Sequence, residues 1–557
     1  MTDQWWRDAV VYQIYPRSFA DGNGDGMGDL PGITARLDAL AELGIDAVWL
    51  SPFYVSPQAD AGYDVADYRD IDPRFGSLAD FDALAERAHA LGLRVIVDLV
   101  PNHSSDEHGW FQQALAAGAG TPERGRYVFR DGKGDNGNEP PNNWQSLFGG
   151  AAWERSTDPD GTPGQWYLHL FDVKQPDFDW TNHEVREMFH DVLRFWLDRG
   201  VDGFRVDVAH ALIKADGLPD APESSVADPA PYEQEIESEA GDRGPMWDQD
   251  GVHEIYRDWN KILGEYPGDR MMVAEAWVSP PSRLARYVRP DEMQQSFNFD
   301  FLTARWNGPA LRAVIDSSLR AVESVGAPAT WVMSNHDVIR HASRLALPGD
   351  EARPGGIGAD DPQPDAVLGL RRARAATALM LALPGSAYVY QGEELGLPEH
   401  TTLPDEARED PTWERSGHTE RGRDGCRVPI PWEADAPSLG FGNTSGTWLP
   451  QPAAYRTLAR DQQRGDPSSM LEFYRRALRL RRELQLGKGR ITWQETDPAI
   501  LAIEIETAAG SVTVIVNLSD ERLEVDDLAA GEVILHSAGP SADQRSLGSD
   551  EAVWVRR

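Results

Sequence analysis

The sequence predicts an α/β protein whose centre is a (β/α)8 TIM barrel, with a subdomain inserted after the third strand and a β-sandwich at the C-terminus. The first observation behind this prediction is an alternation of short apolar runs with helical runs, repeated eight times over roughly 475 residues. The second is that four of the apolar runs end in charged or imidazole side chains. Because the catalytic residues of such barrels lie at the carboxyl ends of the strands, these polar ends predict one active site.

Each barrel element is predicted from its own pattern. The expected strands are short apolar runs at 9–14, 44–52, 94–100, 201–208, 271–277, 296–301, 329–335 and 387–391. The clearest helices are amphipathic or alanine-rich runs at 81–91, 182–199, 252–264, 370–383 and 469–486. Gly44 and Gly92 stand where two helices should end. Strand and helix in alternation at this spacing are typical of a parallel sheet.

The breaks in this alternation predict the domain boundaries. Residues 1–103 form the first part of the barrel, and 104–174, rich in Gly, Asn, Pro and Trp without helical periodicity, form the inserted subdomain. Residues 175–486 form the second part of the barrel, with a polar insertion at 216–251 and a long loop at 398–467. Residues 487–557 begin with a glycine linker, Gly487-Lys-Gly489, and then alternate like the short strands of a β-sandwich.

Composition limits the classes of partner. The net charge is −38, from 53 Lys and Arg against 91 Asp and Glu. A surface this negative repels nucleic acids and anionic lipids, so we expect a neutral small-molecule substrate and neither a nucleic-acid nor a membrane partner. Cys426 is the single cysteine, so the chain cannot form an internal disulfide. We therefore expect a cytoplasmic protein, which is also consistent with an N-terminal stretch that does not resemble a signal peptide.

The run 199–210 holds two charged residues inside a predicted strand. Arg205 and Asp207 alternate with apolar residues, so they share one face of the strand. Burying them costs several kcal/mol unless they pair, and a structural ion pair is the plain alternative to a functional one. Three other runs, however, end similarly, at Asp98 to His103, at Glu275 and at His336-Asp337. Four polar strand ends favour an active site.

The segment D-G-N-G-D-G-M-G-D, residues 21–29, predicts a cation site. Oxygen-bearing side chains stand at every second position with glycines between them, as in the first half of a calcium-binding loop. The twelfth position is Gly32 and not the glutamate of an EF-hand. A glycine-rich turn with surface acids is the alternative. We favour the metal site.

Several ordered motifs resemble one known family. The segments D98-L-V-P-N-H103, G203-F-R-V-D207, E275-A-W277 and S334-N-H-D337 resemble those of the α-amylase superfamily, glycoside hydrolase family thirteen. Q175-P-D-F-D-W180, Q391-G-E-E-L-G-L-P398 and the 21–29 loop support this resemblance, and within the family the chain looks most like the α-glucosidase and oligo-1,6-glucosidase branch. Phe178 and Asp179 depart from the Leu and Asn of oligo-1,6-glucosidases.

The resemblance implies a role for each matching residue. Asp207 would be the nucleophile, Glu275 the general acid and then base, and Asp337 the group that binds the 2- and 3-hydroxyls of the sugar. Arg205 would keep Asp207 ionised, and the apolar neighbours of Glu275 would favour its protonated form. The residues expected to bind the terminal glucose are Asp60, Tyr63, His103, Phe148, Arg205, His336 and Arg427. Structural Ca²⁺ would be bound by Asp21, Asn23, Asp25, the carbonyl of Met27, and Asp29.

The implied activity is a retaining, exo-acting α-glucosidase that releases glucose from the non-reducing end of short α-glucosides, with transglucosylation as a side reaction. We expect the insertions after strands three, four and eight to close one end of the site, with Asp60 and Arg427 pairing around the 4-hydroxyl of the sugar. Two features leave the linkage open. A valine directly after the nucleophile position, here Val208, is typical of family members selective for α-1,6 bonds. The segment R423-D-G-C-R-V-P, in contrast, resembles that of α-glucosidases that act on maltose. Trehalose synthase or sucrose isomerase activity is the alternative on the same scaffold. A binding protein without activity would lack the three carboxylates.

Overall fold

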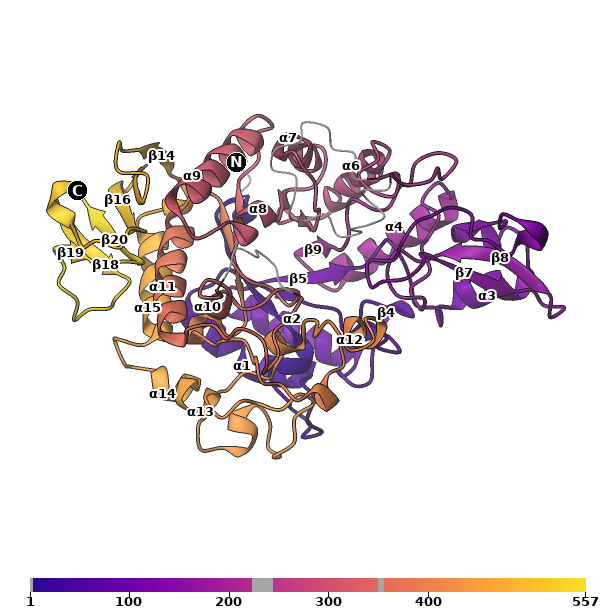
Figure 1. The fold of residues 1–557 in the computed structure, drawn as a ribbon, viewed down its shortest axis with the longest axis horizontal. Coiled ribbons are helices and arrows are strands. Elements are labelled where there is room, and N and C mark those ends of the chain that lie inside the picture. Colours follow the sequence, from indigo (N-terminus) through magenta and orange to yellow (C-terminus); the bar gives the residue numbers. More distant parts are fainter. Residues whose placement is uncertain (1–3, 223–243, 349–354) are drawn as a thin grey trace.

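The computed structural model describes residues 4–222, 244–348 and 355–557, and its centre is an eight-stranded parallel sheet curved into a nearly closed barrel (Figure 1). The strand order is β11-β10-β9-β5-β2-β1-β13-β12, so most neighbours in the sheet are also successive barrel strands in the chain. The barrel strands are β1 Val10–Ile14, β2 Ala47–Leu50, β5 Arg94–Leu99, β9 Gly203–Val206, β10 Met271–Ala274, β11 Gln295–Ser296, β12 Thr330–Val332 and β13 Ser386–Tyr390. The predicted barrel is confirmed.

Helices cover the outside of this barrel. The longer ones are α1 Leu30–Leu43, α2 Leu78–Ala90, α4 His183–Asp198, α6 Val252–Leu263, α9 Gly308–Glu323, α11 Ala366–Ala382 and α15 Met470–Glu483. Their ends follow the sequence: Asp29 caps α1 by accepting the N–H of Gly32, and Gly44 ends it with a left-handed φ of 97°. Short elements join them: β3 Tyr54–Val55, β4 Asp67–Ile71, α7 Pro281–Leu284, α10 His341–Arg344, α12 Pro411–Arg415, α13 Tyr455–Leu458 and α14 Arg460–Gln463.

The sixth barrel strand is shorter than predicted. β11 covers two residues, and Phe299–Thr303 form helix α8 where the sequence suggested a continuing strand. Asn298 causes the change, because its side chain caps α8 by accepting the N–H of Phe301. The fourth and fifth strands also stop early. Asp207 and Glu275 therefore lie just beyond the strand ends.

The insertion between β5 and β9 contains a small antiparallel sheet. Its order is β6-β8-β7, from Phe129–Arg130, Pro163–Leu168 and Trp153–Thr157. It also contains helix α3, Gly109–Ala117, so the expectation that this insertion lacks a helix was wrong. In Figure 1 this part projects from the side of the molecule opposite to the C-terminal sheet. The polar insertion expected at 216–251 lies partly outside the described residues, since 223–243 are not among them.

The C-terminal part is an antiparallel β-domain, as expected. Five strands have the order β14-β15-β16-β20-β18, and two more form the sheet β17-β19. A buried apolar cluster that includes Ile515, Val525 and Val553 lies between these sheets. Trp554 is fully buried, and its indole N–H donates to the carbonyl of Ala378 in α11. The strand bounds are β14 Arg490–Trp493, β15 Ile500–Thr507, β16 Gly510–Asn517, β17 Leu523–Glu524, β18 Glu532–His536, β19 Ser546–Leu547 and β20 Glu551–Arg556.

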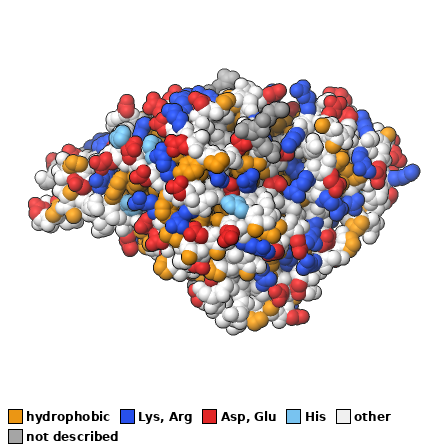
Figure 2. Space-filling view, turned by 180° about the vertical axis from the view of Figure 1, so that it is seen from behind, with side chains coloured by type: hydrophobic (Ala, Val, Ile, Leu, Met, Phe, Trp, Pro, Cys, Tyr) orange, Lys and Arg blue, Asp and Glu red, His pale blue; other side chains and the backbone are white. Residues whose placement is uncertain are grey.

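The surface carries many charged side chains of both signs (Figure 2). Acidic and basic side chains are mixed over the face shown in Figure 2, so its charge is spread over many separate positions. Within the described part of the chain, we find no helix whose length and apolar character would let it cross a bilayer.

Candidate active site

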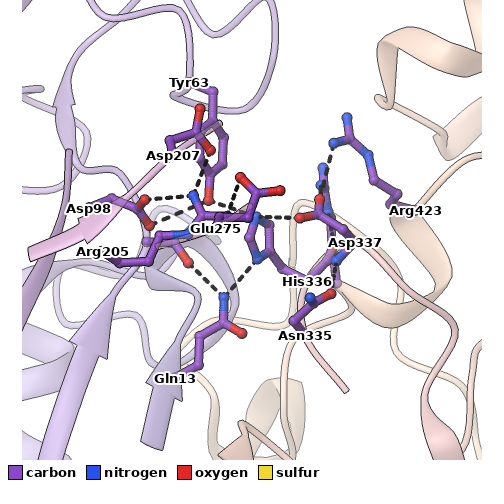
Figure 3. A network of polar contacts seen from close by, with 12 residues as sticks. Gln13, Tyr63, Asp98, Arg205, Asp207, Glu275, Asn335, His336, Asp337 and Arg423 are labelled. Carbon is purple, nitrogen blue, oxygen red and sulfur yellow. Dashed lines mark hydrogen bonds and ion pairs between the residues drawn. The ribbon is translucent and has the colours of Figure 1, made fainter. Parts of the chain in front are cut away.

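The carboxyl ends of neighbouring strands bring four charged residues together (Figure 3). In the register of the parallel sheet, Asp98 of β5 stands beside Arg205 of β9. Val206 stands beside Ala274 of β10. The residues that follow this last pair are Asp207 and Glu275, so the register alone places the two carboxyl groups next to each other.

Arg205 is the centre of this group and is almost fully buried. Its Nη1 donates to Asp98 Oδ1 at 2.8 Å and to Asp207 Oδ1 at 2.6 Å. Its Nη2 lies 3.0 Å from Glu275 Oε2. Asp98 is held on its other side by the indole N–H of Trp49 at 2.9 Å. The guanidinium thus fixes three carboxyl groups that come from three different strands.

Three carboxyl groups around one guanidinium cannot all be ionised without excess negative charge. Burial raises the pKa of Asp207 well above its usual range; Arg205 lowers it, and Glu275 and Asp98 raise it further. Burial also raises the pKa of Asp98 to about 6, against the effect of Arg205. The guanidinium of Arg205 thus favours the ionised form of Asp207, while burial and the two neighbouring carboxyl groups oppose it.

The backbone at Val208 completes the environment of Glu275. Its N–H donates to Glu275 Oε2 at 3.0 Å, and its φ is 43°. This left-handed conformation is rare for a β-branched residue and costs on the order of 1–3 kcal/mol. The strained backbone thus points an N–H at the Glu275 carboxyl group.

His336 and Tyr63 lie beside Arg205 and its carboxyl partners and contact each other. The Tyr63 hydroxyl lies 2.7 Å from His336 Nε2, and the Gln13 amide lies 2.7 Å from Nδ1. The rings of Tyr63 and His336 are parallel, with centroids 5.4 Å apart. Burial lowers the pKa of His336 well below its usual range, so the imidazole is neutral at pH 7.

Asp337 is the ionised carboxylate of the site. Arg423 Nη1 and Arg427 Nη2 each donate to its Oδ1 at 3.1 Å. Although burial opposes ionisation, the positive charges of Arg423 and Arg427 hold the pKa of Asp337 well below its usual range. Its side chain remains 20 % exposed, so its oxygens can accept bonds from an incoming ligand.

The expected pairing of Asp60 with Arg427 was wrong. Asp60 Oδ1 accepts from Arg423 Nη2 at 2.9 Å, whereas Arg427 Nε donates to the carbonyl of His336 at 2.8 Å. The Asp410 side chain is fully buried, and its Oδ2 pairs with Arg423 Nε at 2.6 Å. Sequence reasoning missed Arg423 and Asp410. The signal for Arg423 was present, since the quoted R-D-G-C-R motif has an arginine at each end.

The remaining predicted ligands line the same end of the site. Gln175 Nε2 lies 3.3 Å from Asp60 Oδ2 and 3.1 Å from His103 Nε2. Burial lowers the pKa of His103 to about 4, so it too is neutral. Phe148 lies against Phe171, with ring centroids 5.8 Å apart, and the Arg423 guanidinium lies 5.5 Å above the Phe148 ring. Gln175, in the quoted Q-P-D-F-D-W motif, was also missed as a site residue.

The insertions after the third and eighth barrel strands meet at this end. Arg415, from the loop after β13, pairs with Asp172 of the inserted subdomain at 2.9 Å and donates to the carbonyl of Gly149 at 2.7 Å. Together with Arg423 over Phe148, this contact joins the two insertions beside Asp60. The site is therefore walled on the side where Asp60 lies.

The predicted cation loop at 21–29 is ordered by its own hydrogen bonds. Asp21 accepts the N–H groups of Asn23, Gly24 and Gly26. Asp25 accepts that of Met27 at 2.8 Å, and Asp29 accepts that of Gly22. Asp21 and Asp25 keep further lone pairs, whereas Asp29 already accepts the N–H groups of Gly22, Asn23 and Gly32. An all-oxygen donor set is the kind that Ca²⁺ prefers. In the ranges that the structure describes, no three His, Cys, Asp or Glu side chains form a set that could hold a metal, so main-chain and amide oxygens would have to complete one here.

Comparisons with known proteins agree with this geometry. Residues 13–489 match the family described as "Alpha amylase, catalytic domain". A probable alpha-glucosidase of Rhizobium meliloti (strain 1021) is 38 % identical over 93 % of this chain and 90 % of its own. An oligo-1,6-glucosidase of Parageobacillus thermoglucosidasius is 36 % identical over 86 % of this chain and 84 % of its own. The crystal structure of an alpha-glucosyl transfer enzyme, XgtA, is 37 % identical, with a TM-score of 0.82 and 99 % of both chains covered.

Proposed function

Because the chain belongs to the α-amylase family of glycoside hydrolases, we propose that it is a retaining, exo-acting α-glucosidase acting on short α-glucosides such as maltose and isomaltose. The observation that carries the proposal is the arrangement around Arg205. Two neighbouring carboxyl groups, Asp207 and Glu275, share one guanidinium at the carboxyl ends of β9 and β10. A retaining glycosidase needs such a pair, with one group ionised and the other protonated.

Each residue then has a defined step. Glu275 donates its proton to the glycosidic oxygen while the Asp207 carboxylate attacks the anomeric carbon, so the aglycone leaves and a glucosyl ester forms on Asp207. Glu275, now ionised, takes a proton from a water molecule, whose oxygen attacks the same carbon and releases Asp207. Two inversions retain the α-configuration. Asp337, kept ionised by its arginines, accepts bonds from the 2- and 3-hydroxyls and stabilises the positive charge of the transition state.

The walled end of the site supports exo action. Asp60 and Arg423 form an ion pair at 2.9 Å beside the two joined insertions. A carboxylate and a guanidinium at that position can bind the 4-hydroxyl of a terminal glucose. Tyr63, His103, Phe148 and His336 would hold the same sugar. A polymer cannot pass a closed end, so glucose would leave one unit at a time.

Glucosyl transfer is the second candidate, because XgtA is similar over its whole length. Both activities share the glucosyl ester and differ in whether water or a sugar attacks it. Trehalose synthase and sucrose isomerase activities also share the glucosyl ester, and in them a sugar attacks it in place of water.

Product analysis tests the proposal. Maltose, isomaltose, sucrose, trehalose and soluble starch should be incubated with the enzyme and followed by NMR. We expect α-glucose as the first product of maltose or isomaltose, and little action on starch. Early maltotriose from starch would contradict exo action, and isomeric disaccharides without free glucose would favour transfer. Asp207→Asn should lower kcat by more than ~10³-fold, because an amide cannot form the ester.

We also infer that the 21–29 loop binds structural Ca²⁺. Asp21, Asn23, Asp25 and Asp29 would hold it with their side-chain oxygens, and Met27 with its carbonyl. The ion would supply charge compensation to the loop that precedes α1 and take no part in the chemistry. A cytoplasmic location is inferred from Cys426 being the single cysteine.

A further inference from the structure

The two carboxyl oxygens of Glu275 have different surroundings. Oε2 lies 3.0 Å from the Arg205 guanidinium and accepts the N–H of Val208. Oε1 accepts the indole N–H of Trp277 at 3.2 Å. The positive charge of the guanidinium disfavours a proton on Oε2, so the proton that Glu275 gives to the substrate belongs on Oε1. Trp277 therefore contacts the oxygen that exchanges the proton.

The Trp277 ring is fixed by the interior of the barrel. It stacks on Phe299, the first residue of α8, with ring centroids 3.8 Å apart and planes 5° apart. Phe299 is buried, and its ring lies beside that of Phe297, tilted by 45° with centroids 5.9 Å apart. Both belong to the apolar cluster inside the barrel, against which Trp277 packs. The indole N–H thus has a set position relative to Glu275.

We propose that Trp277 is a positioning residue that stabilises Glu275 as it loses its proton. This inference rests on the proposed role of Glu275 as general acid. While Glu275 is protonated, the indole N–H makes a neutral hydrogen bond to Oε1. When the proton passes to the glycosidic oxygen, the same bond becomes charge-assisted and about twice as strong. An interaction that strengthens along the reaction lowers the barrier.

Other charged groups also act on Glu275. Arg205 and Asp207, from β9 and its end, and Asp98 of β5 interact with it electrostatically. These groups belong to β5 and to β9 and its end, and they are present in the wild type and in a Trp277 variant alike.

The test is Trp277→Phe, which keeps a ring on Phe299 and removes the donor. We expect kcat/KM for maltose to fall about 5- to 15-fold, the size of the difference between a charge-assisted and a neutral hydrogen bond. A 2,4-dinitrophenyl α-glucoside, whose leaving group needs no proton, should lose less than about twofold. The upper limb of the pH profile of kcat/KM for maltose should move up by about 0.5 to 1 unit, because the ionised acid loses a donor.

Two variants complete the experiment. Trp166→Phe removes another indole N–H, bonded at 3.0 Å to a carbonyl in the inserted subdomain, and should leave both substrates and the pH profile unchanged. Trp277→His restores a ring N–H and should recover much of the loss on maltose. Equal losses on the two substrates with an unshifted pH profile would refute the role of Trp277. If Trp277→Phe does not fold, a loss in Trp277→His that is equal on the two substrates refutes the role, and a loss confined to maltose supports it.

Failure of the proposed function is seen separately. Glu275→Gln should lower kcat/KM for maltose far more than kcat/KM for the dinitrophenyl glucoside. If Glu275→Gln affects both substrates equally, Glu275 is not the acid. If it discriminates between them and Trp277→Phe does not, the acid assignment stands and the role of Trp277 falls.

Discussion

Replacing Arg423 by methionine tests one of the site residues that the sequence analysis missed. Arg423 contacts three carboxylates: Asp60 at 2.9 Å, Asp337 at 3.1 Å and Asp410 at 2.6 Å. Methionine has a similar length and no charge, so it removes these contacts with little change in volume. Asp337 keeps Arg427, whereas the ion pairs described for Asp60 and Asp410 are made with Arg423 alone.

The expected size follows from burial. Removing one partner of a buried ion pair costs about 3–5 kcal/mol, because the other charge stays in a medium of low polarity. Proton uptake limits this cost. Burial already raises the pKa of Asp60 to about 6, with Arg423 opposing it, so the variant Asp60 becomes protonated at pH 7. We therefore expect a loss of about 3 kcal/mol in unfolding free energy at pH 7.

Activity should fall as well. A charge-assisted hydrogen bond is worth about 1.5–3 kcal/mol, which corresponds to roughly 10- to 150-fold in kcat/KM for maltose. Most of this loss should be in KM, because Arg423 lies at the closed end of the site and not at Glu275.

The pH dependence gives a further check. In the variant, folded Asp60 binds a proton that the unfolded chain, with a pKa near 4, does not bind above about pH 5. The folded state holds more protons, so its stability falls as pH rises. The stability deficit of the variant should then be smaller at pH 5 than at pH 7. Urea unfolding at both values measures it.

A matched control is Arg36→Met. Arg36 pairs with Glu433 at 3.2 Å on the surface, and its loss should cost under about 1 kcal/mol. Wild-type kcat/KM in Arg423→Met, or a stability deficit that does not change with pH, would refute the placement of Arg423 at the closed end of the site.

Three further predictions concern other parts of the molecule. Chelation should lower the melting temperature and Ca²⁺ should restore it if the 21–29 loop holds the ion; an unchanged melting temperature together with a metal-free elemental analysis would exclude it. Burial lowers the pKa of His341 to about 3, so the unfolded chain alone binds its proton as pH falls below about 6.5. The stability advantage of the wild type over His341→Asn should therefore shrink by about 2 kcal/mol from pH 7 to pH 5 in urea unfolding. A constant difference would show that His341 takes up the proton in the folded state as well. Arg415→Gln should loosen the contact with Asp172 and raise KM for maltose by about fivefold with kcat nearly unchanged, and an unchanged KM would mean that the insertions need no such link.

The sequence by itself determined the barrel and the ends of its strands. Strand and helix differ in periodicity, 2 against 3.6 residues, and periodicity is a property of neighbouring residues. The eight expected strands therefore appear in order, and Asp98, Arg205, Asp207 and Glu275 lie at their carboxyl ends. Where a single side chain overrode periodicity, prediction failed: the Asn298 cap turned the end of the sixth strand into α8.

The tertiary structure alone decided which residues pair. Asp60 and Arg423 are 363 positions apart, and two arginines of one motif were equally available to Asp60. The paths of two loops over the barrel, and Asp410 beneath one of them, selected Arg423. The tertiary structure also sets the pKa of the Asp207 carboxyl group. Arg205 and Asp207 are near in sequence, but the pKa of Asp207 depends on burial and on carboxyl groups from other strands. Long-range packing sets the electric environment of a side chain, and no local pattern encodes it.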